Sequence, residues 1–150
     1  MKISVENIRF FNQKYGCSGD PMPKGIETLV EKINTQLGGV DEVIDLGKKY
    51  QGILVAKVVE CGKHPNADKL SLCLIDDGGA SKQVKRDQKG LVQIVCGAPN
   101  VREGMLAAWL PPGIVVPSTL NKDPLKLEAR EIRGEVSNGM LASASELGIS

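Results

Sequence analysis

The sequence predicts a mainly β fold, a small closed barrel of five strands preceded by a short α+β segment. From about residue 40 the chain consists of short runs in which apolar and polar side chains alternate, and turn residues separate these runs. Before that point the apolar residues of 26–37 recur at helical spacing, and Gly38 and Gly39 end the pattern. A β-sandwich would use about seven strands, so the barrel fits these runs better.

The first segment, 1–39, predicts a strand followed by helices. Residues 2–5 alternate as a short strand, and Asn7 is the expected N-cap of the helix that follows. Residues 17–25 are rich in turn formers and predict a connector, and 26–37 is the clearest helix of the chain. This segment is too short to bury both of its faces, so we expect it to pack against something outside it.

The remaining residues, 40–150, predict the barrel domain. Strands are expected near 52–60, 69–76, 91–96, 105–110 with 114–116, and 124–132, followed by a helical turn near 145–147. The stretch 80–90 interrupts this pattern, because it is polar and holds four basic residues against one acid, Asp87. We expect a solvated, mobile hairpin extension there. A loop that only aids solubility is one interpretation, and a flexible arm that contacts phosphates is the other.

The composition indicates one ordinary domain with an attachment. Its 150 residues are 41% hydrophobic, and the net charge of +1 means that an anionic partner would have to meet a local basic patch. No apolar run approaches the roughly 20 residues of a membrane span, and the start lacks a signal-peptide pattern. The four cysteines form no CxxC pair. We therefore expect reduced thiols in a cytoplasmic protein with no membrane partner.

Three motifs stand in one order along the chain: HPNADKL at 64–70, QIVCGAPNV at 93–101 and IRGEVSNGMLAS at 132–143. Together they closely resemble the tRNA-binding oligonucleotide-binding (OB) barrel of free-standing tRNA-binding proteins, of some methionine–tRNA ligases and of the bacterial phenylalanine–tRNA ligase beta subunit. The opening MKISVENIRF and the helix at 26–37 resemble the start of that beta subunit, a prefix that free-standing relatives lack. The resemblance covers nearly all of the chain and implies a five-stranded OB-fold in an N-terminal fragment of a longer subunit.

The resemblance also implies a function, a non-catalytic module that contributes to tRNA recognition while phenylalanine is attached to tRNA. Its partners would be tRNA and an alpha subunit, the latter contacted through regions absent from this chain. ATP and magnesium would serve the full complex, and no cofactor is expected in this chain. Two alternatives stay open. One is a structural docking module within the synthetase assembly, and the other is a free-standing tRNA-binding chaperone, which the N-terminal prefix disfavours.

The residue inventory indicates how such a module would hold RNA. OB barrels that grip single strands stack bases on exposed aromatic side chains, but the predicted barrel has one tryptophan, Trp109, inside an apolar run, with Tyr50 before its first strand. Recognition of shape and backbone by cations and amides therefore fits better than stacking. The predicted tRNA contacts are Lys57, His64, Asn66, Lys69, Asn100, Arg102, Ser137 and Met140.

Each predicted contact has an ordinary alternative. The cations, with Lys63 added, would form one cationic edge, or they are scattered solubilising charges. Asn66 and Asn100 would reach ribose or phosphate, or they serve their own turns. Ser137 is a contact by resemblance, and Met140 is either a surface contact or a core plug.

Enzymatic interpretations find little support in the sequence. His64 lies three residues after Cys61, and Cys73 and Cys96 follow, but this spacing lacks the second close ligand pair that is typical of zinc sites. A Cys61–His64 nucleophile pair has no orienting third group, and no GxxxxGK phosphate loop occurs. We therefore expect no catalytic residue and no metal site, and we interpret His64 as a loop-packing or edge-binding residue.

Overall fold

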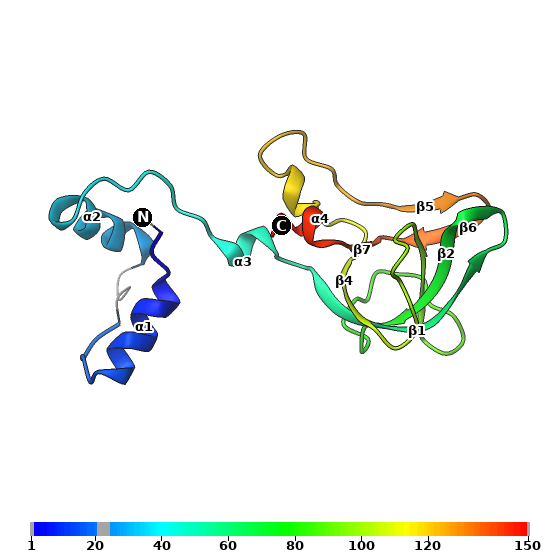
Figure 1. The fold of residues 1–150 in the computed structure, drawn as a ribbon, viewed down its shortest axis with the longest axis horizontal. Helices are drawn as coiled ribbons and strands as arrows, with labels where there is room; N and C mark the ends of the chain where they lie inside the picture. Colours follow the sequence, from blue (N-terminus) through cyan, green and yellow to red (C-terminus); the bar gives the residue numbers. More distant parts are fainter. Residues whose placement is uncertain (1, 21–24, 150) are drawn as a thin grey trace. The chain divides into compact units, whose positions relative to one another are not determined.

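The computed structural model describes residues 2–20 and 25–149 and shows a mainly β protein with helices preceding the sheets (Figure 1). A five-stranded antiparallel sheet is accompanied by a small two-stranded sheet. The chain divides into two compact units, Met1–Ile44 and Asp45–Ser150, and each is described by itself.

The N-terminal unit holds two helices, α1 (Val5–Lys14) and α2 (Ile26–Gln36). The predicted strand at 2–5 is wrong, because Ser4 caps α1 by accepting a hydrogen bond from the Asn7 amide at 3.4 Å. The predicted helix at 26–37 is confirmed, whereas residues 21–24 of the predicted connector lie outside the described residues. Neither helix contains a fully buried residue, so the apolar stripes of this unit remain largely open.

The second unit begins with a short helix, α3 (Leu46–Lys49), and continues into the sheets. The larger sheet has the order β3-β2-β1-β4-β7, built from β1 (Leu54–His64), β2 (Ala67–Asp76), β3 (Val92–Cys96), β4 (Leu106–Leu110) and β7 (Met140–Ala142). The smaller sheet pairs β5 (Ala129–Ile132) with β6 (Glu135–Asn138). A 3-10 turn, η1 (Pro117–Thr119), and the helix α4 (Ala144–Leu147) complete the unit.

Most of the predicted strands are confirmed, and the differences fall in the last third of the chain. The expected runs near 52–60, 69–76, 91–96 and 105–110 correspond to β1 to β4, and the expected helical turn is α4. Val115 forms only an isolated bridge with Lys126, and the strand expected at 124–132 begins at residue 129. The sequence analysis missed β6 and β7, which lie between glycines.

The core lies on one face of the larger sheet and consists mainly of small and branched side chains. Its fully buried members include Ala56, Val58, Cys73, Ile75, Val92, Ile94 and Trp109. Trp109 is 0% exposed, and its indole Nε1 donates to the backbone carbonyl of Asn138 at 2.9 Å. Trp109 therefore packs the interior and offers no surface on which a base could stack.

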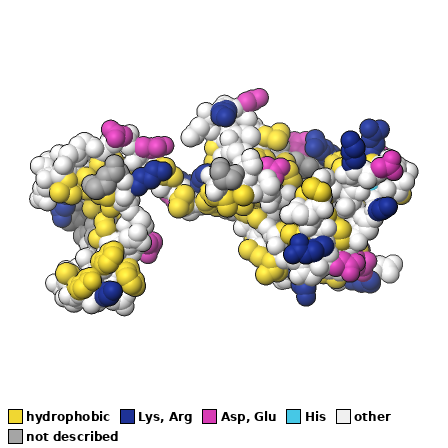
Figure 2. All heavy atoms as spheres, in the orientation of Figure 1, with side chains coloured by type: hydrophobic (Ala, Val, Ile, Leu, Met, Phe, Trp, Pro, Cys, Tyr) yellow, Lys and Arg dark blue, Asp and Glu magenta, His cyan; other side chains and the backbone are white. Residues whose placement is uncertain are grey.

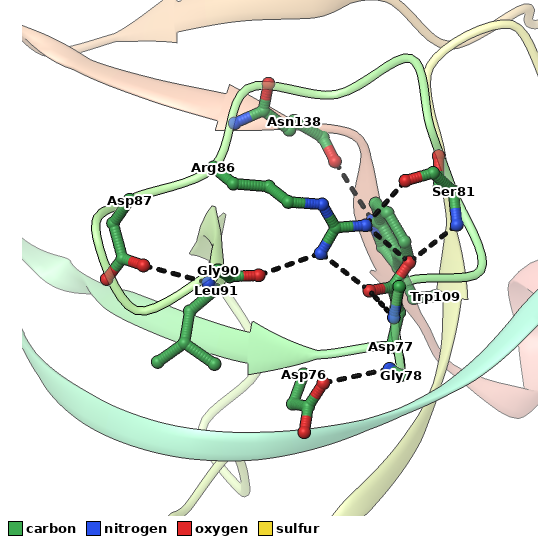
Figure 3. A network of polar contacts seen from close by, with 11 residues as sticks. Asp76, Asp77, Gly78, Ser81, Arg86, Asp87, Gly90, Leu91, Trp109 and Asn138 are labelled. Atoms are coloured by element: carbon green, nitrogen blue, oxygen red, sulfur yellow. Dashed lines mark hydrogen bonds and ion pairs between the residues drawn. The ribbon is translucent and has the colours of Figure 1, made fainter.

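The segment 80–90 connects β2 to β3, but it is not a fully solvated extension as predicted. The Arg86 guanidinium forms two ion-paired hydrogen bonds, 2.8 and 3.0 Å long, with the two carboxylate oxygens of Asp77, whose side chain is fully buried. Figure 3 shows this guanidinium also reaching the backbone carbonyls of Ser81 and Gly90. The Arg86 hydrogen bond holds the pKa of Asp77 down to about 2, assisted by the Ser81 and Gly79 amides. Arg86 thus anchors the segment to the end of β2.

Candidate nucleic-acid interface

Two turns that are far apart in the sequence lie side by side at one end of the second unit. The first is the two-residue turn Pro65-Asn66 between β1 and β2, and the second is Arg133-Gly134 between β5 and β6. His64 Nε2 lies 3.0 Å from the Ile132 carbonyl oxygen, and Asn66 Nδ2 donates to the Arg133 carbonyl at 2.9 Å. These two bonds join the two hairpin ends, and Figure 1 shows the β1–β2 and β5–β6 turns beside each other.

The β5–β6 turn has an unusual backbone. Arg133 and Gly134 have φ angles of 55° and 91°, the combination that a two-residue type I′ hairpin turn requires. Arg133 is the one residue other than glycine with a positive φ among residues 2–20 and 25–149. A Cβ atom on Gly134 would lie 3.3 Å from Asn66 Nδ2, so the close approach of the two turns favours glycine there. The turn therefore displays the Arg133 side chain at a fixed point.

His64, one of the predicted tRNA contacts, is a structural residue of this end. Its side chain is buried, with 4% of the residue exposed. The Asn66 amide donates to Nδ1 at 3.1 Å, which makes Nδ1 the acceptor and assigns the ring proton to Nε2, the atom facing the Ile132 carbonyl. Both ring nitrogens are thus occupied by backbone partners. The loop-packing interpretation of His64 fits this structure, whereas a direct RNA contact does not.

Three exposed cations surround the joined turns. We call Lys63, Lys69 and Arg133 the cationic tip. Within the described part of the chain, no carboxylate forms an ion pair with any of them. Figure 2 shows Lys and Arg side chains, with acidic side chains among them, at the end of the second unit where these hairpins turn. In the described residues the tip therefore presents three cations without an ion-pair partner, at or next to two turns that are fixed to each other.

The structure does not bring Lys57 into this group. Lys57 is exposed in the middle of β1, opposite Asp76 on β2 and Leu106 on β4. Six residues of strand separate it from Lys63, a distance of roughly 20 Å at about 3.3 Å per residue. The predicted single cationic edge therefore does not form at its Lys57 end.

Arg102 and Asn100 lie beside β1 in the loop between β3 and β4. Arg102 Nη1 donates to the Asn100 backbone carbonyl at 3.4 Å, and the next residue, Glu103, accepts from the Cys61 amide at 3.3 Å. Both Arg102 and Asn100 are exposed. They flank the half of β1 nearest the cationic tip without joining the two turns.

Ser137 is buried, whereas Met140 is half-buried. Ser137 is 2% exposed, and its hydroxyl accepts from the Val95 amide and donates to the Gly139 carbonyl, each at 3.0 Å. The hydroxyl is enclosed and both of its hydrogen bonds stay within the chain, which favours a structural role for Ser137 over the predicted ribose or phosphate contact. Met140 is half-buried opposite Leu110 of β4.

The sequence analysis missed how β3 is connected to β6. Gln93 Nε2 donates to the Val136 carbonyl at 3.0 Å, Asn138 Nδ2 donates to the Gln93 carbonyl at 3.1 Å, and Ser137 bonds Val95 as described. We call Gln93, Ser137 and Asn138 the side-chain clasp. The dipeptide Ser-Asn before a glycine is a turn signal, but nothing in it identifies a partner more than forty residues earlier.

Gly139 connects this clasp to β7. Its φ is 90°, and a Cβ atom there would lie 2.1 Å from the Leu110 carbonyl oxygen. No other residue fits that position without a backbone shift.

Other kinds of site find no support in the described residues. Residues 2–20 and 25–149 contain no cluster of three or more His, Cys, Asp or Glu side chains that could hold a metal ion. In the same ranges, no helix has the length and apolar character needed to cross a membrane.

Residues 53–150 match the family model described as "Putative tRNA binding domain". Over 124 residues the chain is 44% identical to the phenylalanine–tRNA ligase beta subunit of Pectobacterium atrosepticum, which covers 83% of this chain and 14% of that protein. It is 40% identical over 126 residues to the corresponding subunit of a Synechococcus species, covering 84% of this chain and 14% of that subunit. The chain thus spans about 14% of the length of these curated relatives.

Proposed function

The chain belongs to the tRNA-binding domain family, and from that premise we propose that it is the non-catalytic tRNA-binding module of a phenylalanine–tRNA ligase beta subunit. The observation that carries the proposal is the cationic tip, because Lys63, Lys69 and Arg133 form no ion pair with any described residue and lie at or next to turns that hold each other in place. Such fixed cations can contact the phosphates of a folded RNA without ordering a loop first.

We further propose that the larger sheet closes into an OB-fold barrel. The side-chain clasp supports this closure, because it ties β3, at one edge of the sheet, to β6. The chain then passes through Gly139 directly into β7, which lies at the other edge. Hydrogen bonds between side chains and the backbone would thus replace some of the backbone hydrogen bonds that close a barrel between its two edge strands, β3 and β7.

The module would recognise RNA by its backbone and shape. Trp109 is enclosed, and the Tyr50 hydroxyl donates to the Leu147 carbonyl at 3.1 Å, so neither ring forms an open stacking platform. Discrimination would come from the spacing of the three cations against the phosphates of folded tRNA. In this proposal the chain works in the cytoplasm, and other regions of the subunit contact the alpha subunit.

ATP and magnesium would be used by other parts of the full synthetase. The described residues offer no cluster of carboxylates that fits a magnesium ion, and we assign no step of the ligase reaction to this chain. Its contribution would be to hold the tRNA and to orient it.

Salt titration tests the proposal. Binding of tRNA to the chain is measured by fluorescence anisotropy between 50 and 200 mM salt, alongside the variant Lys63→Gln/Lys69→Gln/Arg133→Gln. If the tip contacts about three phosphates, the log–log slope is about −2 to −3, and the variant loses most of it. A variant that keeps the wild-type slope and affinity would show that the tip is not the tRNA contact.

A structural docking role is the second candidate, and one observation favours it. The open faces of β1 and β4 expose apolar side chains next to Lys57, with Val55 70% and Leu106 68% exposed. The substitution Val55→Glu/Leu106→Glu separates the two candidates in the full subunit. Loss of assembly with unchanged tRNA affinity would favour docking through this face, whereas unchanged assembly would leave tRNA binding as the function of the module.

A further inference from the structure

Two of the four cysteines face each other across the β1–β2 hairpin. Cys61 and Cys73 are directly opposed in the register, and their Sγ atoms lie 3.5 Å apart. Both are free thiols in this structure. Cys61 is half-buried, whereas Cys73 is fully buried among the core residues. The tRNA-binding function does not use either of them.

The backbone geometry of this pair suits a covalent link. The Cys61 amide donates to Glu103 at 3.3 Å, and the adjoining residues Gly104 and Met105 bond Val58, so this amide points away from β2. Cys61 and Cys73 are therefore a non-hydrogen-bonded antiparallel pair, for which the Cα atoms lie about 4.5 Å apart. That separation falls within the range of about 4.4–6.8 Å that disulfides use.

We propose that Cys61 and Cys73 form an oxidisable dithiol site, which a peroxide converts to a cross-strand disulfide within the folded protein. The Cys61 sulfur attacks one peroxide oxygen, so that the O–O bond breaks and leaves a sulfenic acid and one water. The Cys73 sulfur then attacks the Cys61 sulfur, the S–S bond forms, and the S–O bond breaks to release a second water. The net reaction joins two thiols and one hydrogen peroxide into one disulfide and two waters.

The order of these steps follows from burial. Cys61 is the thiol that a small oxidant can reach from solvent. Burial, followed by the contact with Cys61, raises the pKa of the Cys73 thiol, so this partner stays protonated and reacts second.

A third cysteine offers the nearest competing partner. Cys96 is buried on β3, where it pairs with Ser71 while Cys73 pairs with Ile94. Cys73 and Cys96 are thus diagonal neighbours, whose Cα atoms lie about 7–8 Å apart, beyond the usual limit for a disulfide. The geometry therefore selects Cys61 as the partner of Cys73.

Peroxide treatment of the full chain tests the proposal. The exposed Cys17 is first replaced in a Cys17→Ser background, the folded protein is treated with hydrogen peroxide, and the remaining thiols are blocked with N-ethylmaleimide. We expect the intact mass to fall by two hydrogen atoms and a non-reducing peptide map to show a Cys61–Cys73 link. Adding Cys96→Ser should preserve the link, and adding Cys61→Ser should abolish it.

Three results would overturn the proposal: Cys61 oxidised to a sulfinic acid without a link, a link to Cys96 instead, or no reaction of Cys61 at all. Thermal unfolding provides an independent readout. The melting temperature of the oxidised protein should be on the order of 10 °C higher, because the disulfide lowers the conformational entropy of the unfolded chain. Dithiothreitol should reverse this increase. A lower melting temperature after oxidation would show that the folded hairpin does not accommodate the bond.

Discussion

The cationic tip and the segment 80–90 are both basic in sequence, yet the structure uses their charges in opposite ways. In the segment, Arg86 binds the buried Asp77 carboxylate, and Lys89 Nζ lies 2.8 Å from Glu60 Oε1. At the tip, no described carboxylate pairs with Lys63, Lys69 or Arg133. Two of the four cations of the segment, Arg86 and Lys89, thus pair with carboxylates of this chain, whereas none of the three tip cations does so in the described residues.

The number of cations in a sequence segment therefore does not indicate how many of them can bind phosphate. A guanidinium has five N–H donors, and Arg86 directs four hydrogen bonds to acceptors of its own chain. The two turns at the tip are held together by hydrogen bonds of His64 and Asn66 with backbone groups. The charged side chains of the tip are therefore not needed to stabilise the turns and can contact a phosphate. The following predictions test this contrast.

The largest expected effect is on stability, from the variant Arg86→Gln. Removing the guanidinium leaves the buried Asp77 carboxylate with only the Gly79 and Ser81 amides as partners. We expect the free energy of unfolding to fall by about 3 kcal/mol, measured by urea denaturation at pH 7. The matched control is Lys85→Gln, the same change of charge at the adjacent exposed position, which should alter stability by less than about 0.5 kcal/mol. Equal losses in both variants would contradict the anchor role of Arg86.

Part of the fold could be predicted from the sequence and part could not. Alternation of apolar residues predicted β1 to β4, because each of these strands buries one face against a shared core. Strands β6 and β7 escaped detection because Gly134 and Gly139 cut the region into runs of three or four residues. Ser4 was overlooked as a cap because its helix begins within a run that also alternates like a strand.

The position of the HPN turn could be predicted from the sequence, whereas the contacts that its residues make could not. The HPN turn was identified from its rigid residues, and the structure places it at the end of a hairpin. Its bonds to Ile132 and Arg133, however, connect residues more than sixty positions apart, and no local pattern encodes such a pairing. Ser137 is a further example. Its glycine-rich surroundings in the sequence suggest an exposed hydroxyl, but in the fold this hydroxyl accepts a hydrogen bond from the distant Val95 amide.

The next largest effect concerns tRNA affinity and compares the two basic regions directly. Lys63→Glu/Lys69→Glu and Lys82→Glu/Lys85→Glu change the net charge by the same amount, at exposed positions in each region. We expect the first pair to weaken tRNA binding on the order of 30-fold at 100 mM salt and the second to change it less than about threefold. Equal losses would mean that long-range charge, and not the tip, governs binding. Circular dichroism of both variants confirms that the fold is retained.

Acid titration of stability should isolate the Asp77–Arg86 pair. The Arg86 hydrogen bond lowers the pKa of Asp77 from the ordinary value of 3.8 to about 2, so the unfolded chain takes up this proton first as the pH falls. The stabilisation is therefore fully present above about pH 5 and is lost between about pH 4 and pH 2, an effect of about 2 kcal/mol. Urea denaturation across this range measures it. The Asp77→Asn variant should lack this part of the pH dependence, and an unchanged profile would contradict the assignment.

The smallest effect tests how far the RNA-contacting surface extends. Lys57 is exposed, like the tip cations, but lies roughly 20 Å along β1 from Lys63 and opposite Asp76. Since the Debye length is about 8–10 Å at 100–150 mM salt, Lys57→Gln should change tRNA affinity less than twofold, whereas Lys63→Gln should weaken it about three- to fivefold. The two variants carry the same change of charge on the same strand, so they differ only in position. If Lys57→Gln proved as damaging as Lys63→Gln, the RNA would have to run along β1 past Arg102, and the functional surface would be the strand and not its end.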